Sequence, residues 1–272
     1  MGAIFALGSS GECPAMTSAL KLELVDAIAD ALGGRVPFLA GVTSTSYGVS
    51  LDLAREFGER GVDAIVATTP YYFHYRQSEL IDYFTRLAEE SPLPLVIYDI
   101  PGRSDNELAP ETVLGLSEHE RIIGIKDSTG NIERGIDLVT ALRGRDDFAM
   151  FQGSERLLAL AVLSGYDGGV LGLANAFPRL CVAVCEAAAS RDLQRAQELQ
   201  ELINSAFPWF FAADPGTTNG SGIVGAMKVG QELQGLCSRR TFFPMRRLTD
   251  EDVQSIKRYI DPLADAGWIT YA

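Results

Sequence analysis

The sequence predicts an α/β barrel in which parallel strands alternate with helices. Short apolar runs alternate with longer amphipathic segments through the first two-thirds of the 272-residue chain. Nearly all of these runs are apolar on both faces, as expected for a parallel sheet that helices cover. Polar side chains stand directly after several different runs. In a barrel these carboxyl ends of the strands converge on one mouth, where active sites are built.

Seven apolar runs are predicted strands. They cover residues 3–8, 36–42, 64–69, 95–100, 122–126, 148–152 and 169–173. The amphipathic segments between them predict helices over residues 22–32, 51–58, 78–90, 110–117 and 132–142. A closed (β/α)8 TIM barrel has eight strands, so either the first β-α unit is absent from this chain or one of its strands does not show in the apolar pattern.

An open, doubly wound sheet is the alternative architecture. It would place the polar residues along one edge, with a crevice only at the switch point of the strand order. Neither GxGxxG nor GxxxxGK[ST] opens a helix in this chain, so the nucleotide-binding signatures typical of open sheets are missing. The polar residues at several strand ends therefore favour the barrel.

The last third of the sequence is helical. Predicted helices cover residues 179–189, 192–211, 223–234 and 250–264, which is more than the single helix that closes a barrel. A stretch rich in Gly, Ser and Thr at 216–222 interrupts them. We expect residues 1–190 to form the barrel, and residues 191–272 to supply its closing helix and a C-terminal helical extension of the same domain.

Composition excludes several classes of function. A net charge of −13 argues against a nucleic-acid surface, and no apolar run approaches the length of a membrane span. The first residues lack the features of a signal peptide, and the four cysteines show no CxxC spacing, which indicates a reduced, cytoplasmic protein. With only two histidines, neither a metal site nor a Ser-His-Asp hydrolase is expected.

Lys126 is the residue with the clearest chemical potential. It ends an apolar strand, so its amine is expected near a dry barrel interior. Desolvation disfavours the charged form of an amine and leaves a nucleophile, which attacks a ketone to give an iminium. The alternative is a surface lysine that pairs with Asp127.

Tyr98 ends the preceding strand and could shuttle protons beside such an amine, or it could be an ordinary core aromatic residue. The turn with Ser9, Ser10 and Gly11 offers hydroxyls and backbone N–H groups that suit a carboxylate, although plain capping of the following helix by a serine or Thr17 is a common alternative.

Two loops at strand ends carry further candidates. Tyr72 belongs to the aromatic run PYYFHY at 70–75, which indicates a lid, a subunit contact or a small hydrophobic cluster. Arg103 could clamp a carboxylate, although a lone loop arginine is more often solvated.

Taken together, these motifs resemble the dihydrodipicolinate synthase/N-acetylneuraminate lyase family of class I aldolases. The resemblance runs in order from about Gly2 to Asn175 and more loosely beyond. Its motifs are GSSGE at 8–12, RVPFLAGV at 35–42, TPYY at 69–72, YDIPGR at 98–103, GIKDS at 124–128, GYDGGV at 165–170 and AN at 174–175. The family's first strand and helix have no counterpart before Met1, so the resemblance implies a (β/α)8 TIM barrel that lacks its first β-α unit.

The resemblance implies a role for each candidate residue. Lys126 would form the Schiff base with pyruvate, and Tyr98 would relay protons. Ser9 would link Tyr98 to Tyr72, which in relatives reaches into the site of a neighbouring subunit. The remaining candidates would bind the substrate; they are Ser10, Gly11, Arg103, Gly153 and Val170. No metal or cofactor is implied, and members are commonly tetramers built as dimers of dimers.

The resemblance therefore implies a lyase that condenses, cleaves or dehydrates a small 2-keto acid, with an aldehyde as a further substrate. Arg103 stands where the synthases place an arginine that binds the aldehyde's carboxylate, so a lysine-biosynthetic synthase is one alternative. Phe73 replaces a polar residue of the synthases, and the segment matching their lysine pocket lacks the expected side chains, which favours a catabolic aldolase or dehydratase. An alternative of another class is a non-catalytic keto-acid-binding or scaffold protein, inactivated by the missing first unit.

Overall fold

The computed structural model describes residues 2–215 and 220–272. The described residues fall into two compact units. One lies within Met1–Gly153 and Ser164–Gly168, and the other within Ser154–Leu163 and Gly169–Ala272. This division reflects which residues pack together. The predicted division into a barrel (residues 1–190) and a closing helix with a helical extension (residues 191–272) is of another kind and stays a prediction.

A parallel sheet is the centre of the first unit. Within the described residues it has seven strands in chain order: β1 (Ile4–Ala6), β2 (Phe38–Gly41), β3 (Ala64–Thr68), β4 (Leu95–Asp99), β5 (Ile122–Asp127), β6 (Ala149–Gln152) and β7 (Gly168–Gly169, whose last residue belongs to the second unit). Neighbouring strands from β1 to β6 pair in parallel. This confirms the predicted α/β fold with a parallel sheet, while the absence of a first β-α unit stays a prediction.

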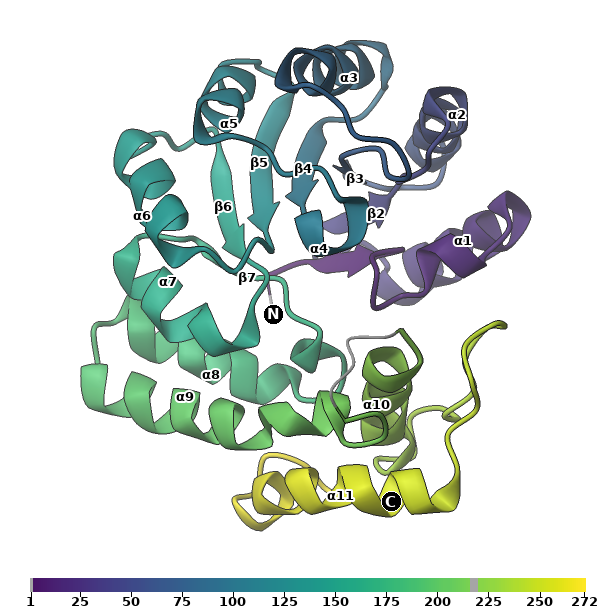
Figure 1. Ribbon diagram of the computed structural model, residues 1–272, viewed down its shortest axis with the longest axis vertical. Helices are drawn as coiled ribbons and strands as arrows, with labels where there is room; N and C mark the ends of the chain where they lie inside the picture. Colours follow the sequence, from purple (N-terminus) through teal and green to yellow (C-terminus); the bar gives the residue numbers. More distant parts are fainter. Residues whose placement is uncertain (1, 216–219) are drawn as a thin grey trace. The chain divides into compact units, whose positions relative to one another are not determined.

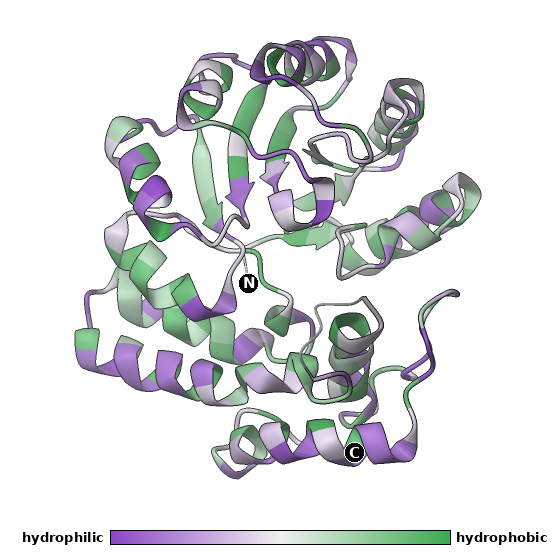
Figure 2. Cartoon of the chain, in the orientation of Figure 1, coloured by the Kyte–Doolittle hydropathy of each residue, from purple (hydrophilic) through white to green (hydrophobic). Residues whose placement is uncertain are grey.

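Helices between the strands range along the outer face of the sheet (Figure 1). They are α1 (Ser18–Leu32), α2 (Tyr47–Gly58), α3 (Gln77–Glu90), α5 (Pro110–Ser117) and α6 (Ile132–Ala141), with the short α4 (Pro101–Ser104) directly after β4. Every residue of β3 and β4 is buried, and Figure 2 shows hydrophobic and hydrophilic residues alternating along the helices around the sheet. A sheet covered in this way needs strands that are apolar on both faces, as the sequence has.

Two helices begin earlier than their apolar patterns predict, because a hydroxyl caps each of them. Thr17 Oγ1 accepts a hydrogen bond from the Leu20 N–H at 3.3 Å at the start of α1. Ser46 Oγ accepts one from the Val49 N–H at 3.5 Å at the start of α2. Such caps satisfy N–H groups that lack a partner within the helix, so the first turn forms without an apolar face of its own.

The seventh strand is much shorter than predicted. Residues 169–173 are expected to be extended, but β7 covers only Gly168–Gly169, and a 3-10 helix follows at Leu173–Asn175. Glycine has no side chain to pack against neighbouring strands and a high entropic cost of ordering, so a glycine-rich run supports little strand.

The second unit is built from helices. They are α7 (Leu158–Ser164, whose last residue belongs to the first unit), α8 (Pro178–Ala189), α9 (Leu193–Ala206), α10 (Gly220–Glu232) and α11 (Asp250–Asp265). The single helix predicted over 192–211 is wrong in its last part. The chain changes to a 3-10 helix at Phe207–Phe211, where Pro208 lacks the N–H that would continue the α-helical bonds.

The break predicted at 216–222 lies partly outside the described residues, which resume at 220, where α10 begins. No helix among the described residues combines the length and the apolar character that a membrane span requires.

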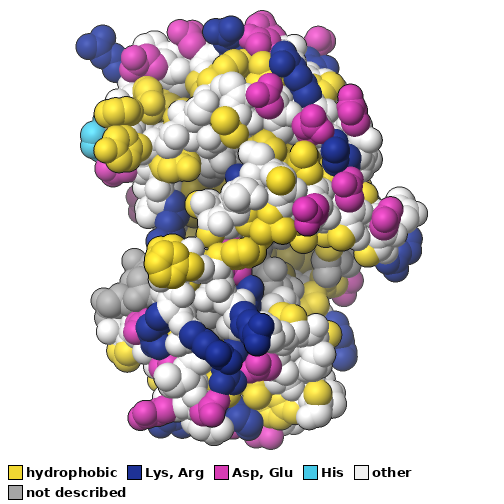
Figure 3. Space-filling view, turned by 90° about the vertical axis from the view of Figure 1, so that its right-hand side faces the viewer, with side chains coloured by type: hydrophobic (Ala, Val, Ile, Leu, Met, Phe, Trp, Pro, Cys, Tyr) yellow, Lys and Arg dark blue, Asp and Glu magenta, His cyan; other side chains and the backbone are white. Residues whose placement is uncertain are grey.

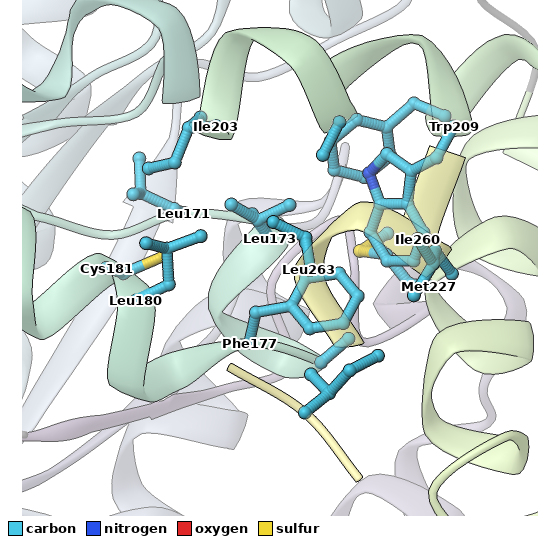
Figure 4. Packing of buried hydrophobic residues seen from close by; sticks show 14 of the residues in the cluster. Leu171, Leu173, Phe177, Leu180, Cys181, Ile203, Trp209, Met227, Ile260 and Leu263 are labelled. Carbon is cyan, nitrogen blue, oxygen red and sulfur yellow. The ribbon is translucent and has the colours of Figure 1, made fainter. Parts of the chain in front are cut away.

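The second unit has its own hydrophobic core. Figure 4 shows its side chains converging from α8, α9, α10 and α11, with the rings of Phe177 and Trp209 among them. The centroids of these two rings are 5.0 Å apart, and both side chains are almost completely buried. The core therefore depends on close contact between helices that are far apart in the sequence.

We expect Leu180→Ala in α8 to lower the free energy of unfolding by about 2–5 kcal/mol, because the fully buried leucine would leave a cavity. Leu193→Ala in α9 is the matched control. Its leucine is 61% exposed, so the expected change is within about 0.5 kcal/mol. Chemical denaturation of the two variants measures both values, and equal losses would contradict this packing.

Candidate active site

The register of the sheet brings Tyr98 and Lys126 side by side. Tyr98 in β4 pairs with Lys126 in β5, and residues in register on neighbouring strands point to the same face. The Lys126 Nζ lies 4.0 Å from the centroid of the Tyr98 ring. Two residues predicted from separate strand ends are therefore direct neighbours.

A second aromatic ring lies against the same amine. Phe5 in β1 meets the Tyr98 ring edge-on, with centroids 6.2 Å apart and an angle of 85° between the planes. The Lys126 Nζ is 5.4 Å from the Phe5 centroid. The faces of aromatic rings attract a cation, so both rings favour the position of the amine between them.

The Tyr98 hydroxyl is the centre of a polar group within the first unit. It hydrogen-bonds with Lys126, Ser9 and Ser128, although its side chain is only 4% exposed. Burial alone would raise the pKa of Tyr98, but the charge of Lys126 and these hydrogen bonds outweigh it, and the pKa is lowered. A phenol held in this way can give up and recover a proton more readily than an isolated one.

The turn after β1 carries the predicted carboxylate-binding residues. Ser9 reaches Tyr98 from this turn. The Gly11 N–H donates to the Gly8 carbonyl at 3.1 Å and so closes the turn itself. Of the two residues predicted to grip a carboxylate here, Gly11 shapes the turn through its backbone, and the role of the Ser10 hydroxyl stays a prediction.

Gly153 lies against Ser128 at the carboxyl ends of β5 and β6. The Gly153 N–H donates to the Asp127 carbonyl at 2.7 Å. A Cβ at Gly153 would lie 1.8 Å from the Ser128 Oγ and 3.0 Å from the Asp127 carbonyl oxygen. The missing side chain therefore makes room for the hydroxyl that hydrogen-bonds with Tyr98, and the predicted contact of Gly153 with a substrate stays a prediction.

Gly153→Ala should displace Ser128 and remove one of the hydrogen bonds that lower the pKa of Tyr98. We expect the titration of Tyr98 to move to higher pH and the free energy of unfolding to fall by about 1–3 kcal/mol. Ultraviolet titration, with Tyr98→Phe to identify the signal, measures the shift. Gly115→Ala in α5, where a Cβ meets nothing within 4 Å, is the control. A wild-type titration in Gly153→Ala would contradict the steric argument.

Tyr72 lies on an exposed aromatic loop. Its side chain is 84% exposed, that of Phe73 is 65% exposed, and their rings meet edge-on at 5.0 Å. Tyr72 also has a φ of 88°, which is rare for a bulky residue. Figure 3 shows exposed hydrophobic side chains gathered beside a histidine at the surface. The predicted link from Ser9 to Tyr72 would need the Tyr72 of another subunit and stays a prediction.

The remaining candidates lie at other places. Arg103 is exposed in α4, directly beyond the end of β4 that carries Tyr98. Val170 belongs to the second unit, and its predicted contact with a bound acid stays a prediction. In the part of the chain that the structure describes, no group of three or more His, Cys, Asp or Glu side chains could hold a metal ion.

Two residues that contact Tyr98, namely Phe5 and Ser128, are absent from the residues predicted for the site. Phe5 stands in the first strand and Ser128 two residues after Lys126, so each lies in a segment that the sequence marks as a strand or a strand end. The alternation of side chains in β5 assigns Ser128 to the same face as Lys126, and this signal could have identified it. Nothing in the sequence indicates that Phe5 lies against Tyr98.

Comparisons with known proteins identify the family of this chain. The family model described as the dihydrodipicolinate synthetase family matches residues 1–262. A 4-hydroxy-tetrahydrodipicolinate synthase of Polynucleobacter asymbioticus is 34% identical over 215 residues, which are 78% of this chain and 70% of the relative. The synthase of Dechloromonas aromatica is also 34% identical, over 72% of this chain and 67% of the relative.

Solved structures give the same result. A dihydrodipicolinate synthase of Bacteroides thetaiotaomicron superimposes with a TM-score of 0.90 at 30% identity, covering 97% of this chain and 87% of that one. A chloride-inhibited dihydrodipicolinate synthase of Acinetobacter baumannii, complexed with pyruvate, gives a TM-score of 0.88 at 28% identity, covering 99% and 88%. This chain therefore belongs to the dihydrodipicolinate synthetase family, and it is an enzyme of the lyase type that this family comprises.

Proposed function

We propose that this enzyme is a class I lyase that binds pyruvate or a related 2-keto acid as a Schiff base on Lys126. The observation that carries the proposal is the Lys126 amine 4.0 Å from the ring centre of Tyr98, whose hydroxyl hydrogen-bonds with the same amine and with Ser9. A nucleophile beside a proton-transfer group is the arrangement that imine formation needs. The pyruvate complex of the Acinetobacter relative supports the choice of substrate.

The chemistry follows from these positions. The neutral Lys126 amine attacks the keto carbon and forms a carbinolamine. Tyr98 passes a proton to the carbinolamine oxygen, which leaves as water when the C–N double bond forms. The resulting iminium takes up electrons from the adjacent carbon when that carbon loses a proton, and the enamine formed attacks an aldehyde carbon. Because the iminium is itself the electron sink, the proposed reaction requires no metal or organic cofactor.

Borohydride trapping tests the proposal. The protein is incubated with pyruvate, reduced with sodium borohydride, and its intact mass is compared with that of protein reduced alone. We expect one reduced pyruvate adduct per chain, and peptide mapping should place it on Lys126. Wild-type protein that gains no mass under these conditions would refute the proposal. An adduct without turnover of any aldehyde would instead indicate a keto-acid-binding protein.

A second candidate is narrower: a 4-hydroxy-tetrahydrodipicolinate synthase. The names of the two curated relatives and the position of Arg103 beyond the Tyr98 strand end favour it. Arg103 would bind the carboxylate of an aldehyde partner as a bidentate pair. A screen of pyruvate with aspartate semialdehyde and other aldehydes, and of 2-keto-3-deoxy sugar acids alone, separates the synthase from a catabolic aldolase or dehydratase.

We also propose that the active enzyme is an oligomer in which Tyr72 enters the site of a second copy. The exposed rings of Tyr72 and Phe73 support this, because an apolar loop tip of this kind gains stability by packing against another surface. Sedimentation analysis of Tyr72→Ala and Phe73→Ala variants should show weaker association than wild type.

A further inference from the structure

A buried carboxylate follows each of the two central residues of the site. Asp99 comes directly after Tyr98, and Asp127 directly after Lys126, and the two aspartates are in register on β4 and β5. Successive side chains of a strand point to opposite faces, so both aspartates lie on the face of the sheet away from the amine. Their side chains are 0% and 1% exposed.

Two neighbouring buried carboxylates repel each other and need a cation nearby. Arg134, in the first turn of α6, supplies it. Its Nη2 is 2.6 Å from the Asp99 Oδ2, and its Nη1 forms an ion pair with the Asp127 Oδ1 at 3.6 Å. The guanidinium is itself buried, at 5% exposure, so neither partner is screened by water. One planar group thus contacts the ends of both strands.

Other groups fix each member of this cluster. Arg134 also donates to the Leu108 carbonyl at 2.8 Å, and Glu107 lies 3.7 Å from its Nε. The Tyr166 hydroxyl donates to the Asp127 Oδ2 at 2.8 Å. A Cβ at Gly135, beside Arg134, would lie 2.0 Å from the Tyr166 hydroxyl oxygen, so α6 carries a glycine where Tyr166 passes.

The carboxylate cluster and the site share the same backbone. Burial raises the pKa of Asp99 to about 7, and Arg134 opposes this effect while Asp127 adds to it. Any shift of Asp99 relative to Asp127 must move Tyr98 relative to Lys126, because each aspartate is joined to its neighbour by one peptide bond. The Ser128 N–H donates to the Asp99 carbonyl at 2.8 Å, which ties the two strand ends on the backbone as well.

We propose that Arg134 is a positioning residue, which binds Asp99 and Asp127 from behind the sheet and so holds the Tyr98 hydroxyl in register with the Lys126 amine. This inference rests on the proposed Schiff-base function for its kinetic consequence, but its structural part stands on the cluster alone. A planar guanidinium can contact both carboxylates at once, whereas a lysine ammonium is a point charge.

The test compares Arg134→Met and Arg134→Lys with wild type by two measurements on folded protein. The first is the rate of borohydride-trappable adduct formation with pyruvate, which we expect to fall about 10–100-fold in Arg134→Met and by a smaller factor in Arg134→Lys. The second is the ultraviolet titration of Tyr98, identified by subtracting Tyr98→Phe, which should move to higher pH as the tyrosine loses its partners. A purely structural arginine would change stability without moving this titration.

Arg145→Met is the matched control. Arg145 binds Asp147 and Glu118 at the surface, so its loss should leave both measurements at the wild-type values. If Arg134→Met does not fold, the same two measurements on Arg134→Lys test the inference, because this variant keeps a positive charge beside the two buried carboxylates. Folded Arg134 variants with the wild-type trapping rate and the wild-type Tyr98 titration would overturn the inference. Wild-type protein that traps no pyruvate would instead refute the proposed function, and the titration would still test the position of Tyr98.

Discussion

Lys126→Ala should abolish the pyruvate adduct and lower turnover at least about 10³-fold. The variant loses the amine that forms the covalent bond, and neither Tyr98 nor Ser9 can replace it, because their hydroxyls are weaker nucleophiles and cannot form an iminium. Without the iminium, the carbanion at the carbon next to the keto group has no electron sink. Intact mass after borohydride reduction and a coupled assay with the best aldehyde measure the two effects.

Lys257→Ala is the control for this experiment. Lys257 in α11 also lies over a tyrosine ring, with its Nζ 4.5 Å from the Tyr271 centroid, so the two lysines share a cation–π contact. Only Lys126 has a hydrogen-bonded phenol in register on the neighbouring strand. We expect Lys257→Ala to trap pyruvate as wild type does. An adduct of wild-type yield on Lys126→Ala protein would show that another amine is the nucleophile.

Where strands lie could be predicted from the sequence, because burial on both faces leaves a continuous apolar run. The strand predicted over 122–126 is observed as β5, which is one residue longer. The strand predicted over 64–69 is observed as β3, which is one residue shorter. The pattern fails where side chains contribute little to packing, as at Gly168–Gly169, and where proline changes the backbone bonds, as at Pro208. Local chemistry, rather than hydrophobic periodicity, decides those segments.

The site could be predicted only in part. Lys126, Tyr98 and Ser9 stand at strand ends, so topology alone brings them to one edge of the sheet. Which side chains touch depends on the register between strands, which the sequence does not contain. The contact of Phe5 with Tyr98 and the ion pairs of Arg134 both depend on that register and on how α6 packs against the sheet.

Tyr98→Phe should lower turnover roughly 10²–10⁴-fold while the protein stays folded. Phenylalanine keeps the ring that lies under the Lys126 amine and beside Phe5, so the packing of the amine is retained. Only the hydroxyl is lost, and with it the proton that would go to the carbinolamine oxygen. Because water must leave before the iminium forms, the trapping rate with pyruvate should fall together with turnover.

The expected split of the kinetic constants distinguishes this role from substrate binding. A proton relay acts in the transition state, so kcat should fall with little change in KM for pyruvate, whereas loss of a binding contact would raise KM. Tyr259→Phe on the partly exposed face of α11 is the control and should leave both constants unchanged. A Tyr98→Phe protein with wild-type kcat would refute the relay. Since the Ser9 and Ser128 hydroxyls both hydrogen-bond with Tyr98, either would then be the group to replace next.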